Sequence, residues 1–204
     1  MKVIGLCGGS GSGKGTVARI LSDLGFCHID TDAVYHTLTS FPSPCVRELI
    51  DAFGEGIFKD GRLDRSALFK IVFEGEDIGE KQRLLNRITH KHIKERTIAL
   101  IEKFKGEGKE AVLVDAPLLF ESEFDKLCSS VICVVAEENI RINRIVERDG
   151  IEFMKARMRI RSQLPNDYLI SRSDYVIENN GTEEELKLAT VAIGKKILNM
   201  KEEK

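Results

Sequence analysis

Short continuous apolar runs alternate along the chain with stretches in which apolar residues recur at helical spacing. Five runs predict buried strands, at residues 3–7, 26–30, 111–114, 131–135 and 175–177. Between them, sets such as Val17, Ile20, Leu21 and Leu24 predict amphipathic helices. Strands that alternate with helices indicate an α/β fold built on a doubly wound parallel sheet.

The first 30 residues predict a strand, a loop, a helix and a second strand. The strand at 3–7 is followed by a glycine-rich segment at 8–15 and by a helix that we expect to end at Gly25, a typical C-cap residue. This order is that of a βαβ unit. Near the other end, Thr182 and Glu185 form a capping-box pattern that opens a last helix to about Asn199.

Two regions extend beyond plain crossover helices. Residues 31–108 carry a mostly helical signal that is too long for a single crossover, so we expect a helical subdomain there. Residues 137–172 are helical and rich in arginine, and they form a second candidate subdomain. Both would belong to one domain covering 1–204, with a charged and frayed tail at 201–204.

Composition narrows the range of functions. The 204 residues carry a formal charge of -2, which argues against a polycation that binds nucleic acid through phosphates alone. The apolar runs are too short to span a bilayer, so we expect no membrane partner. The five cysteines are odd in number and lack C-x-x-C spacing, which favours reduced thiols in a cytoplasmic protein.

The glycine-rich segment carries the strongest chemical signal. Gly8, Gly13 and Lys14 match a P-loop, in which backbone N–H groups surround phosphate oxygens and the lysine adds positive charge. A turn without a ligand, or a dinucleotide site, explains the strand, helix and lysine less well. We therefore expect ATP to be bound by Gly9, Gly11, Ser12, Gly13, Lys14, Gly15 and Thr16.

One position of the P-loop departs from the pattern. Gly15 stands where a Ser or Thr would bind Mg²⁺, and Thr16 comes one residue later. The metal would then be held through waters, or Thr16 has another role. Asp115 follows a predicted strand, as a metal-binding acid does, although it equally fits a residue that bonds to a neighbouring turn.

Two further groups fit phosphoryl transfer. Asp32 follows the second strand, where a carboxylate could take the proton of an acceptor hydroxyl; the alternative is that it caps the next helix. Among the arginines of 137–172, we choose Arg144 as the group that offsets charge on the transferring phosphoryl, while most of the others fit a solvated basic face. Both choices also agree with a resemblance that extends beyond the P-loop.

The chain resembles the dephospho-coenzyme A kinase family over nearly its whole length. Specific segments are IDTDAVYH at 29–36, similar to the family's I-D-A-D signature, PLLFE at 117–121 and SDYVIENNG at 173–181. Further matches lie at 8–16, 60–65, 88–90, 144–149 and 159–165. The chain departs from the family pattern at Cys7, Gly15 and Lys91, where Thr, Ser and Pro are usual.

The resemblance implies a P-loop kinase fold with a helical substrate-binding subdomain and a helical lid. It implies that the enzyme transfers the γ-phosphoryl group of ATP to the ribose 3′-hydroxyl of dephospho-CoA, with Mg²⁺ as a cofactor. Asp32 matches the catalytic aspartate, Arg144 the lid arginine and Asn179 an adenine contact; His90, Pro117 and Leu118 would bind the acceptor. We expect a monomer or weak homo-oligomer.

Two other functions stay open at this point. The Gly-Lys-Gly-Thr sequence is similar to adenylate kinases, which makes a nucleoside monophosphate kinase the nearest alternative. A nucleotide-dependent switch or assembly ATPase would release ADP without any acceptor. A panel of acceptors separates the three.

Overall fold

The computed structural model describes residues 1–40, 43–74 and 77–200, which belong to two compact units. The sheet unit contains residues 1–29 and 103–200, and the helical unit is Asp30–Glu102. The expected charged tail at 201–204 lies outside the described residues. In the described part of the chain, no helix has the length and apolar character that a bilayer crossing needs.

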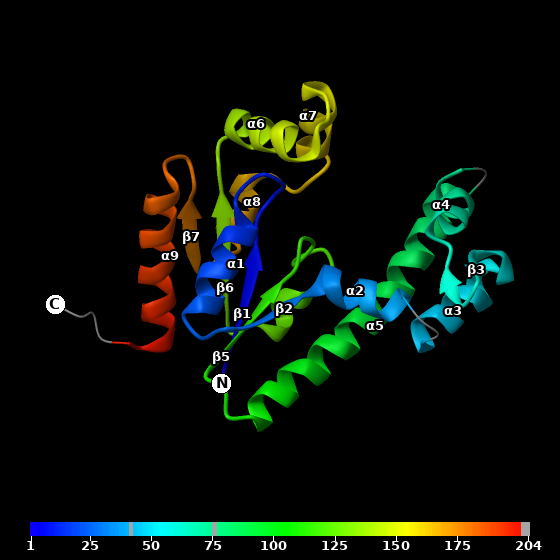
Figure 1. The fold of residues 1–204 in the computed structure, drawn as a ribbon, viewed down its shortest axis with the longest axis horizontal. Helices are drawn as coiled ribbons and strands as arrows, with labels where there is room; N and C mark the ends of the chain where they lie inside the picture. The colour runs from blue at the N-terminus through cyan, green and yellow to red at the C-terminus, as the bar shows by residue number, and fades with distance from the viewer. Residues whose placement is uncertain (41–42, 75–76, 201–204) are drawn as a thin grey trace. The chain divides into compact units, whose positions relative to one another are not determined.

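A five-stranded sheet forms the centre of the sheet unit (Figure 1). Its strands are β1 (Lys2–Cys7), β2 (Cys27–Asp30), β5 (Ala111–Asp115), β6 (Ser130–Val135) and β7 (Tyr175–Glu178), in the order β2-β5-β1-β6-β7. β1 pairs in parallel with both β5 and β6, and β6 pairs in parallel with β7. The predicted α/β fold is confirmed. Because the chain builds outward from β1 in both directions, the loop after β1 lies at the switch point where such sheets bind ligands.

Two helices cover one face of this sheet. α1 (Lys14–Asp23) and α9 (Glu183–Leu198) lie side by side (Figure 1), and their apolar residues share a core with the strands. This core contains Ile4 and Leu6 of β1, Leu21 of α1 and Leu186 of α9. The predicted capping box is present, since Thr182 and Glu185 each accept a hydrogen bond from the other's backbone N–H. The 3₁₀ turn η2 (Phe124–Leu127) contacts β1, and α8 (Asn166–Ser171) contacts β6.

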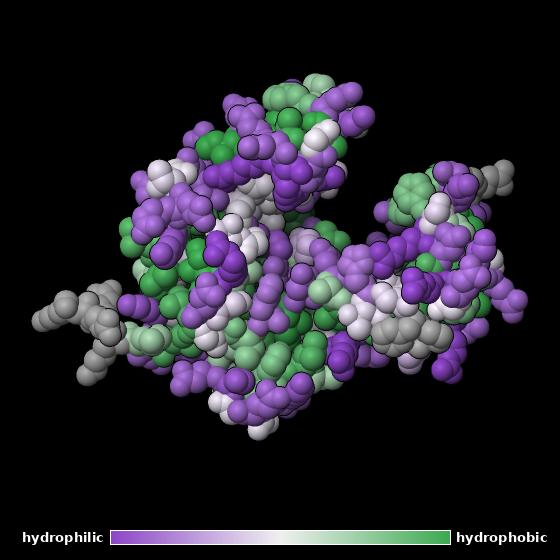
Figure 2. All heavy atoms as spheres, in the orientation of Figure 1, coloured by the Kyte–Doolittle hydropathy of each residue, from purple (hydrophilic) through white to green (hydrophobic). Residues whose placement is uncertain are grey.

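The basic region folds into a helical hairpin, which we call the α6–α7 hairpin. α6 (Glu138–Asp149) and α7 (Phe153–Arg161) pack through Ile142, Ile145, Ala156 and Ile160. At the end of α6, Asp149 accepts hydrogen bonds from Arg148 and from Arg159 of α7. Hydrophilic residues cover much of this hairpin in Figure 2, as expected for a largely solvated basic face.

The helical unit has its own small core. Its helices are α2 (Thr31–Thr39), α3 (Pro44–Phe53), α4 (Arg65–Phe73) and most of α5 (Ile78–Gly106). Cys45, Leu49, Val72 and Ile88 are among the residues buried together there. Glu48 of α3 accepts hydrogen bonds from Lys91, at 2.9 Å, and from His92, at 2.7 Å, so a charged contact joins α3 to α5.

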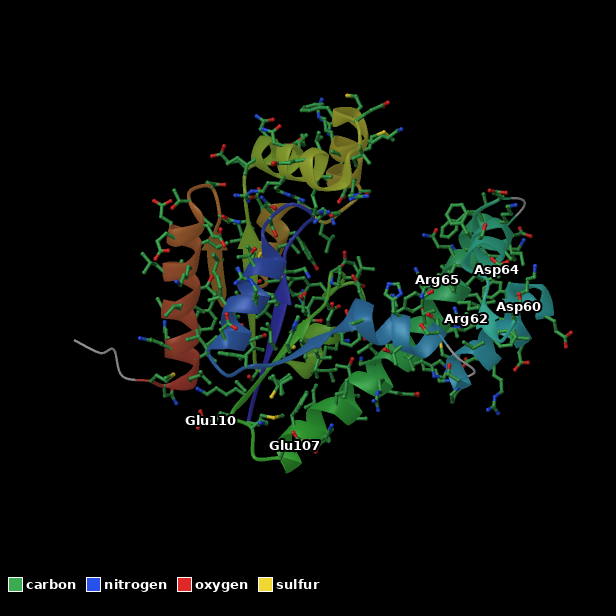
Figure 3. The ribbon with its side chains drawn as sticks, viewed as in Figure 1. Asp60, Arg62, Asp64, Arg65, Glu107 and Glu110 are labelled. Atoms are coloured by element: carbon green, nitrogen blue, oxygen red, sulfur yellow. The ribbon has the colours of Figure 1, made fainter. Side chains whose placement is uncertain are left out.

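A β-hairpin interrupts the region that the sequence pattern predicts to be mostly helical. After the 3₁₀ turn η1 (Glu55–Ile57), β3 (Phe58–Lys59) pairs antiparallel with β4 (Arg62–Leu63). Its turn is Asp60-Gly61, with φ of 51° and 78°, and Asp-Gly with both residues left-handed is the preferred two-residue hairpin turn. Figure 3 shows Asp60, Arg62, Asp64 and Arg65 gathered at this hairpin and the start of α4. The strands are too short for their alternation to be visible in the sequence.

Candidate active site

The loop between β1 and α1 has the backbone that its glycines require. Gly11 and Gly13 have φ of 77° and 97°, a region that favours glycine. A Cβ atom at Gly11 would lie 2.6 Å from the carbonyl oxygen of Arg141, and one at Gly13 would collide with the side-chain amide of Asn179. The predicted loop therefore depends on glycine both for its conformation and for close neighbours.

The first turn of α1 faces this loop. The carbonyl oxygen of Gly13 accepts hydrogen bonds from the N–H groups of Thr16, at 3.0 Å, and Val17, at 3.2 Å, which starts the helix at the loop's end. A helix N-terminus carries partial positive charge and favours anions. Inside the loop, the Ser12 hydroxyl is buried and has no hydrogen-bond partner among the described residues. A buried hydroxyl without a partner is costly, by about 1–3 kcal/mol, and a phosphate oxygen could supply one.

Lys14, the first residue of α1, forms an ion pair with Asp115, the last residue of β5. Their side chains are 19% and 8% exposed, so water screens the pair only partly. His28 of β2 forms a hydrogen bond with the other carboxylate oxygen of Asp115, at 3.3 Å between Nε2 and Oδ2. Burial alone would raise the pKa of Asp115, but the hydrogen bond from His28 and the charge of Lys14 outweigh it and keep the pKa below its ordinary value. Asp115 is therefore a carboxylate at neutral pH.

Arg144 lies against the glycine loop. Its Nη1 donates to the carbonyl oxygens of Gly11, at 3.3 Å, and Asn179, at 3.1 Å, and its Nη2 donates to Asn179 Oδ1 at 3.3 Å. The Asn179 amide donates in turn to the Ser12 carbonyl at 2.8 Å. The structure thus brings the predicted arginine of α6 to the predicted phosphate loop. Both ends of the Asn179 side-chain amide are used by protein groups, so an adenine contact by Asn179 stays a prediction.

Arg141 is a site residue that sequence reasoning missed. It lies one helical turn before Arg144 and is only 4% exposed. Its Nε donates to the carbonyl oxygen of Ser10 at 2.9 Å, and its Nη2 donates to Gln163 Oε1 at 3.0 Å. In sequence it is one of eight basic residues between 141 and 172, and nothing in the spacing separates the buried member from the solvated ones. His28 was missed for a similar reason, because only the strand order makes β2 a neighbour of β5.

The two aspartates after the second strand have different structural roles. Asp30 caps α2, since its carboxylate accepts hydrogen bonds from the N–H groups of Asp32, at 2.8 Å, and Ala33, at 3.2 Å. Asp32 lies in the first turn of α2 and is exposed. The capping role weighed for Asp32 therefore belongs to Asp30.

The remaining predicted residues belong to different elements. Pro117 and Leu118 follow β5 in a turn, and Leu118 is 48% exposed. His90 is half-buried in α5. Gly15 is exposed in the first turn of α1, and a Cβ there would meet no atom within 4 Å, so the fold does not require glycine at this position.

Few groups near the loop could hold a metal ion. Among residues 1–40, 43–74 and 77–200, no three His, Cys, Asp or Glu side chains are grouped as a metal site. The Thr16 hydroxyl and the Asp115 carboxylate are oxygen donors, which suits Mg²⁺. Since Mg²⁺ at nucleotide sites takes most of its ligands from phosphates and water, this small donor set fits it.

The loop, its lysine and the helix that follows, placed after the central strand of this sheet, define the class of P-loop kinase folds. The family model for dephospho-CoA kinase matches residues 2–185. The dephospho-CoA kinase of Corynebacterium glutamicum is 40% identical over 184 residues, 90% of each chain. The chain belongs to the dephospho-CoA kinase family.

Solved structures share the fold of this chain. TT1252 from Thermus thermophilus superposes with a TM-score of 0.76 at 30% identity, covering 94% of this chain and 95% of that one. The dephospho-CoA kinase from Campylobacter jejuni has a TM-score of 0.72 and covers 97% of both chains, and at 24% identity it supports the fold.

Proposed function

We propose that this chain transfers the γ-phosphoryl group of ATP to the 3′-hydroxyl of the ribose in dephospho-CoA, giving coenzyme A and ADP. Membership in the dephospho-CoA kinase family supports the reaction. The observation that carries it within this chain is the glycine loop, which has Lys14 at its end and Arg144 hydrogen-bonded to the Gly11 carbonyl.

In this proposal the loop holds the triphosphate. Backbone N–H groups of residues 9–16 and the positive end of α1 bind the phosphate oxygens, and the buried Ser12 hydroxyl gains a partner. The ammonium group of Lys14, which is paired with the Asp115 carboxylate, would pair with the outer phosphates instead. Arg144 supports the group in transit, where negative charge is spread over the equatorial oxygens.

Asp32 is our proposed base. It lies in the first turn of α2, two residues beyond the end of β2, and its carboxylate is exposed. A carboxylate oriented toward the acceptor takes the proton as the hydroxyl oxygen bonds to phosphorus, and the electron pair of the broken P–O bond leaves on ADP. Asp30 maintains the helix that carries Asp32.

Mg²⁺ is proposed as the cofactor, with Thr16 and Asp115 as the protein groups that would hold it directly or through water. When bound, it neutralises phosphate charge. With glycine at position 15, we expect the chain to supply fewer ligands than loops that carry a hydroxyl there.

The other regions receive roles by the same proposal. Residues 137–172, which include the α6–α7 hairpin, would act as the lid, and residues 31–108 would contain the coenzyme-binding subdomain. His90, Pro117 and Leu118 would contact the acceptor. Asn179 would contact adenine.

All five cysteines are free, which supports our placement of the enzyme in the cytoplasm.

A panel of acceptors tests the proposal. ADP release is measured with ATP and Mg²⁺ in the presence of dephospho-CoA, of AMP, of CMP or of no acceptor. We expect turnover that depends on dephospho-CoA. Preference for a nucleoside monophosphate, or ADP release that is independent of acceptor, would support one of the two alternatives instead.

A further inference from the structure

The buried guanidinium of Arg141 has only neutral hydrogen-bond partners. In the described part of the chain, no carboxylate forms an ion pair with it. Its donors go to the Ser10 carbonyl, to Gln163 Oε1 and, at 3.2 Å, to Asn166 Oδ1. Burial lowers the pKa of Arg141, and the charge of Glu138, one turn earlier on α6, offsets this only in part. Burying a charged group whose direct hydrogen-bond partners are all neutral is costly, which indicates that the guanidinium is kept for the groups that it holds.

Ser10 is held from both sides by this arrangement. Its N–H donates to Gln163 Oε1 at 2.9 Å, its hydroxyl accepts from Gln163 Nε2 at 3.1 Å, and its carbonyl accepts from Arg141. Gln163 accepts from both Ser10 and Arg141, so the three residues form a closed ring of hydrogen bonds.

The ring determines the direction of one loop amide. All described peptide bonds are trans, and in a trans peptide the carbonyl and the following N–H point in opposite directions. Because Arg141 fixes the Ser10 carbonyl on its own side, the Gly11 N–H points away from Arg141. The same reasoning applies to Asn179, which fixes the Ser12 carbonyl and thereby the Gly13 N–H.

We infer that Arg141, acting with Gln163, is a positioning residue that holds the Ser10-Gly11 peptide in the orientation in which the Gly11 N–H binds an ATP phosphate. This inference rests on the proposed function and deepens it. The guanidinium is suited to the task, because its planar fork reaches the Ser10 carbonyl with one nitrogen and Gln163 with another, which a single ammonium group does not.

The test compares Arg141→Met, Arg141→Lys and Gln163→Leu with the wild type. Loss of a hydrogen bond that involves a charged group typically changes an equilibrium constant about tenfold or more. We therefore expect Arg141→Met to raise KM for ATP by about this factor. The kcat should change less than about threefold, because loop amides bind the phosphates alike in the ground and transition states. KM for dephospho-CoA should be unchanged.

The variants distinguish positioning from a structural role. Loss of folded protein lowers the apparent kcat and leaves KM unchanged, so a KM effect confined to ATP is specific. Arg141→Lys should remain impaired, and Arg141→Met combined with Gln163→Leu should be no worse than the more severe single variant, since both break one ring. Arg19→Met, which removes an exposed arginine of α1 that is paired with Glu183 and lies outside the α6–α7 hairpin, is the control and should behave as the wild type.

Direct ATP binding, measured by displacement of a fluorescent ATP analogue, separates this inference from the proposed function. If the wild type shows no acceptor-dependent turnover but Arg141→Met weakens ATP binding, the proposed function fails and the positioning role is supported. The inference is overturned if folded Arg141→Met binds ATP within about twofold of the wild type. Full recovery in Arg141→Lys, or multiplied effects in the double variant, would equally overturn it.

Discussion

The ammonium group of Lys14 is paired with the carboxylate of Asp115, which lies at the carboxyl end of the neighbouring strand β5. The lysine that is proposed to meet phosphate is thus already held beside the loop by an anion. A bound triphosphate would compete with that carboxylate for the same ammonium group. Substitution of Lys14 should therefore weaken nucleotide binding, whereas substitution of Asp115 should not weaken it and could strengthen it.

Replacing Lys14 by Met should impair the enzyme most directly. With the ammonium group removed, we expect KM for ATP to rise and kcat/KM to fall at least about a hundredfold, since this charge meets the phosphates throughout the reaction. Steady-state kinetics measures the effect, with Lys126→Met, an exposed lysine paired with Glu123, as the control. Equal loss in both variants, or no loss in Lys14→Met, would contradict the role of Lys14.

Asp115→Asn should separate nucleotide binding from turnover. The amide keeps the shape of the side chain but no longer competes for Lys14, so ATP binding in the presence of EDTA should be unchanged or tighter. Turnover with Mg²⁺ should fall by about 10- to 100-fold if Asp115 helps to hold the metal, as partners of a metal site do. Asp125→Asn, which changes a carboxylate of η2 that is paired with Arg172, is the matched control. Weaker ATP binding in EDTA would contradict this account.

Asp32→Asn should keep ATP binding and lose turnover. Removing a general base costs roughly 10²–10⁴-fold, whereas the loop and Lys14 are unaffected. Asp30→Asn is a close control, because asparagine also caps helices well and α2 should remain intact. Near-normal turnover in Asp32→Asn, or a similar loss in Asp30→Asn, would show that Asp32 is not the base.

Gly15→Ser should be tolerated and should strengthen metal use. The added side chain meets open space, and serine in place of an exposed helical glycine stabilises the fold by about 0.5 kcal/mol. Its hydroxyl adds a ligand for Mg²⁺, so the Mg²⁺ concentration for half-maximal activity should decrease several-fold. Gly11→Ser, where the Cβ would meet Arg141, should instead lose ATP binding. An unchanged Mg²⁺ requirement in Gly15→Ser would argue against a metal at this position.

The pH dependence of stability should report the contacts of Asp149 in the α6–α7 hairpin. Hydrogen bonds from Arg148 and Arg159 lower the pKa of Asp149 to about 2. Because the folded pKa is lower than the unfolded one, the stabilisation is complete above about pH 5, starts to fall near pH 4 and is lost as the pH passes through the folded value. Denaturant unfolding of the wild type and Asp149→Asn between pH 7 and 3 should show a difference that narrows toward pH 3. A constant difference would contradict the assignment.

The sequence was sufficient for the parts of the fold that depend on local pattern. Apolar runs predicted all five strands of the main sheet, and the capping box predicted the start of α9. The β3–β4 hairpin was missed because two-residue strands show no alternation, although Asp60-Gly61 was a usable turn signal.

The site was only partly predictable for a physical reason. The loop, Lys14 and Asp115 follow from a motif and a strand end, whereas Arg144 was chosen among the basic residues of 137–172 in agreement with the resemblance. In the structure Lys14 pairs with Asp115, and Arg144 donates to the Gly11 carbonyl of the loop. Arg141, Gln163 and His28 contribute through contacts between residues 87 to 153 positions apart in the chain, which spacing does not reveal.

The most direct measurement is identification of the phosphorylated product. The protein is incubated with Mg²⁺, dephospho-CoA and ATP labelled on the γ-phosphate, and the products are separated and analysed by mass spectrometry. We predict that the label appears in coenzyme A, on the 3′-oxygen of its ribose, in equal amount to the ADP formed. Label found only in inorganic phosphate, or dephospho-CoA recovered unchanged while a nucleoside monophosphate is phosphorylated, would contradict the account.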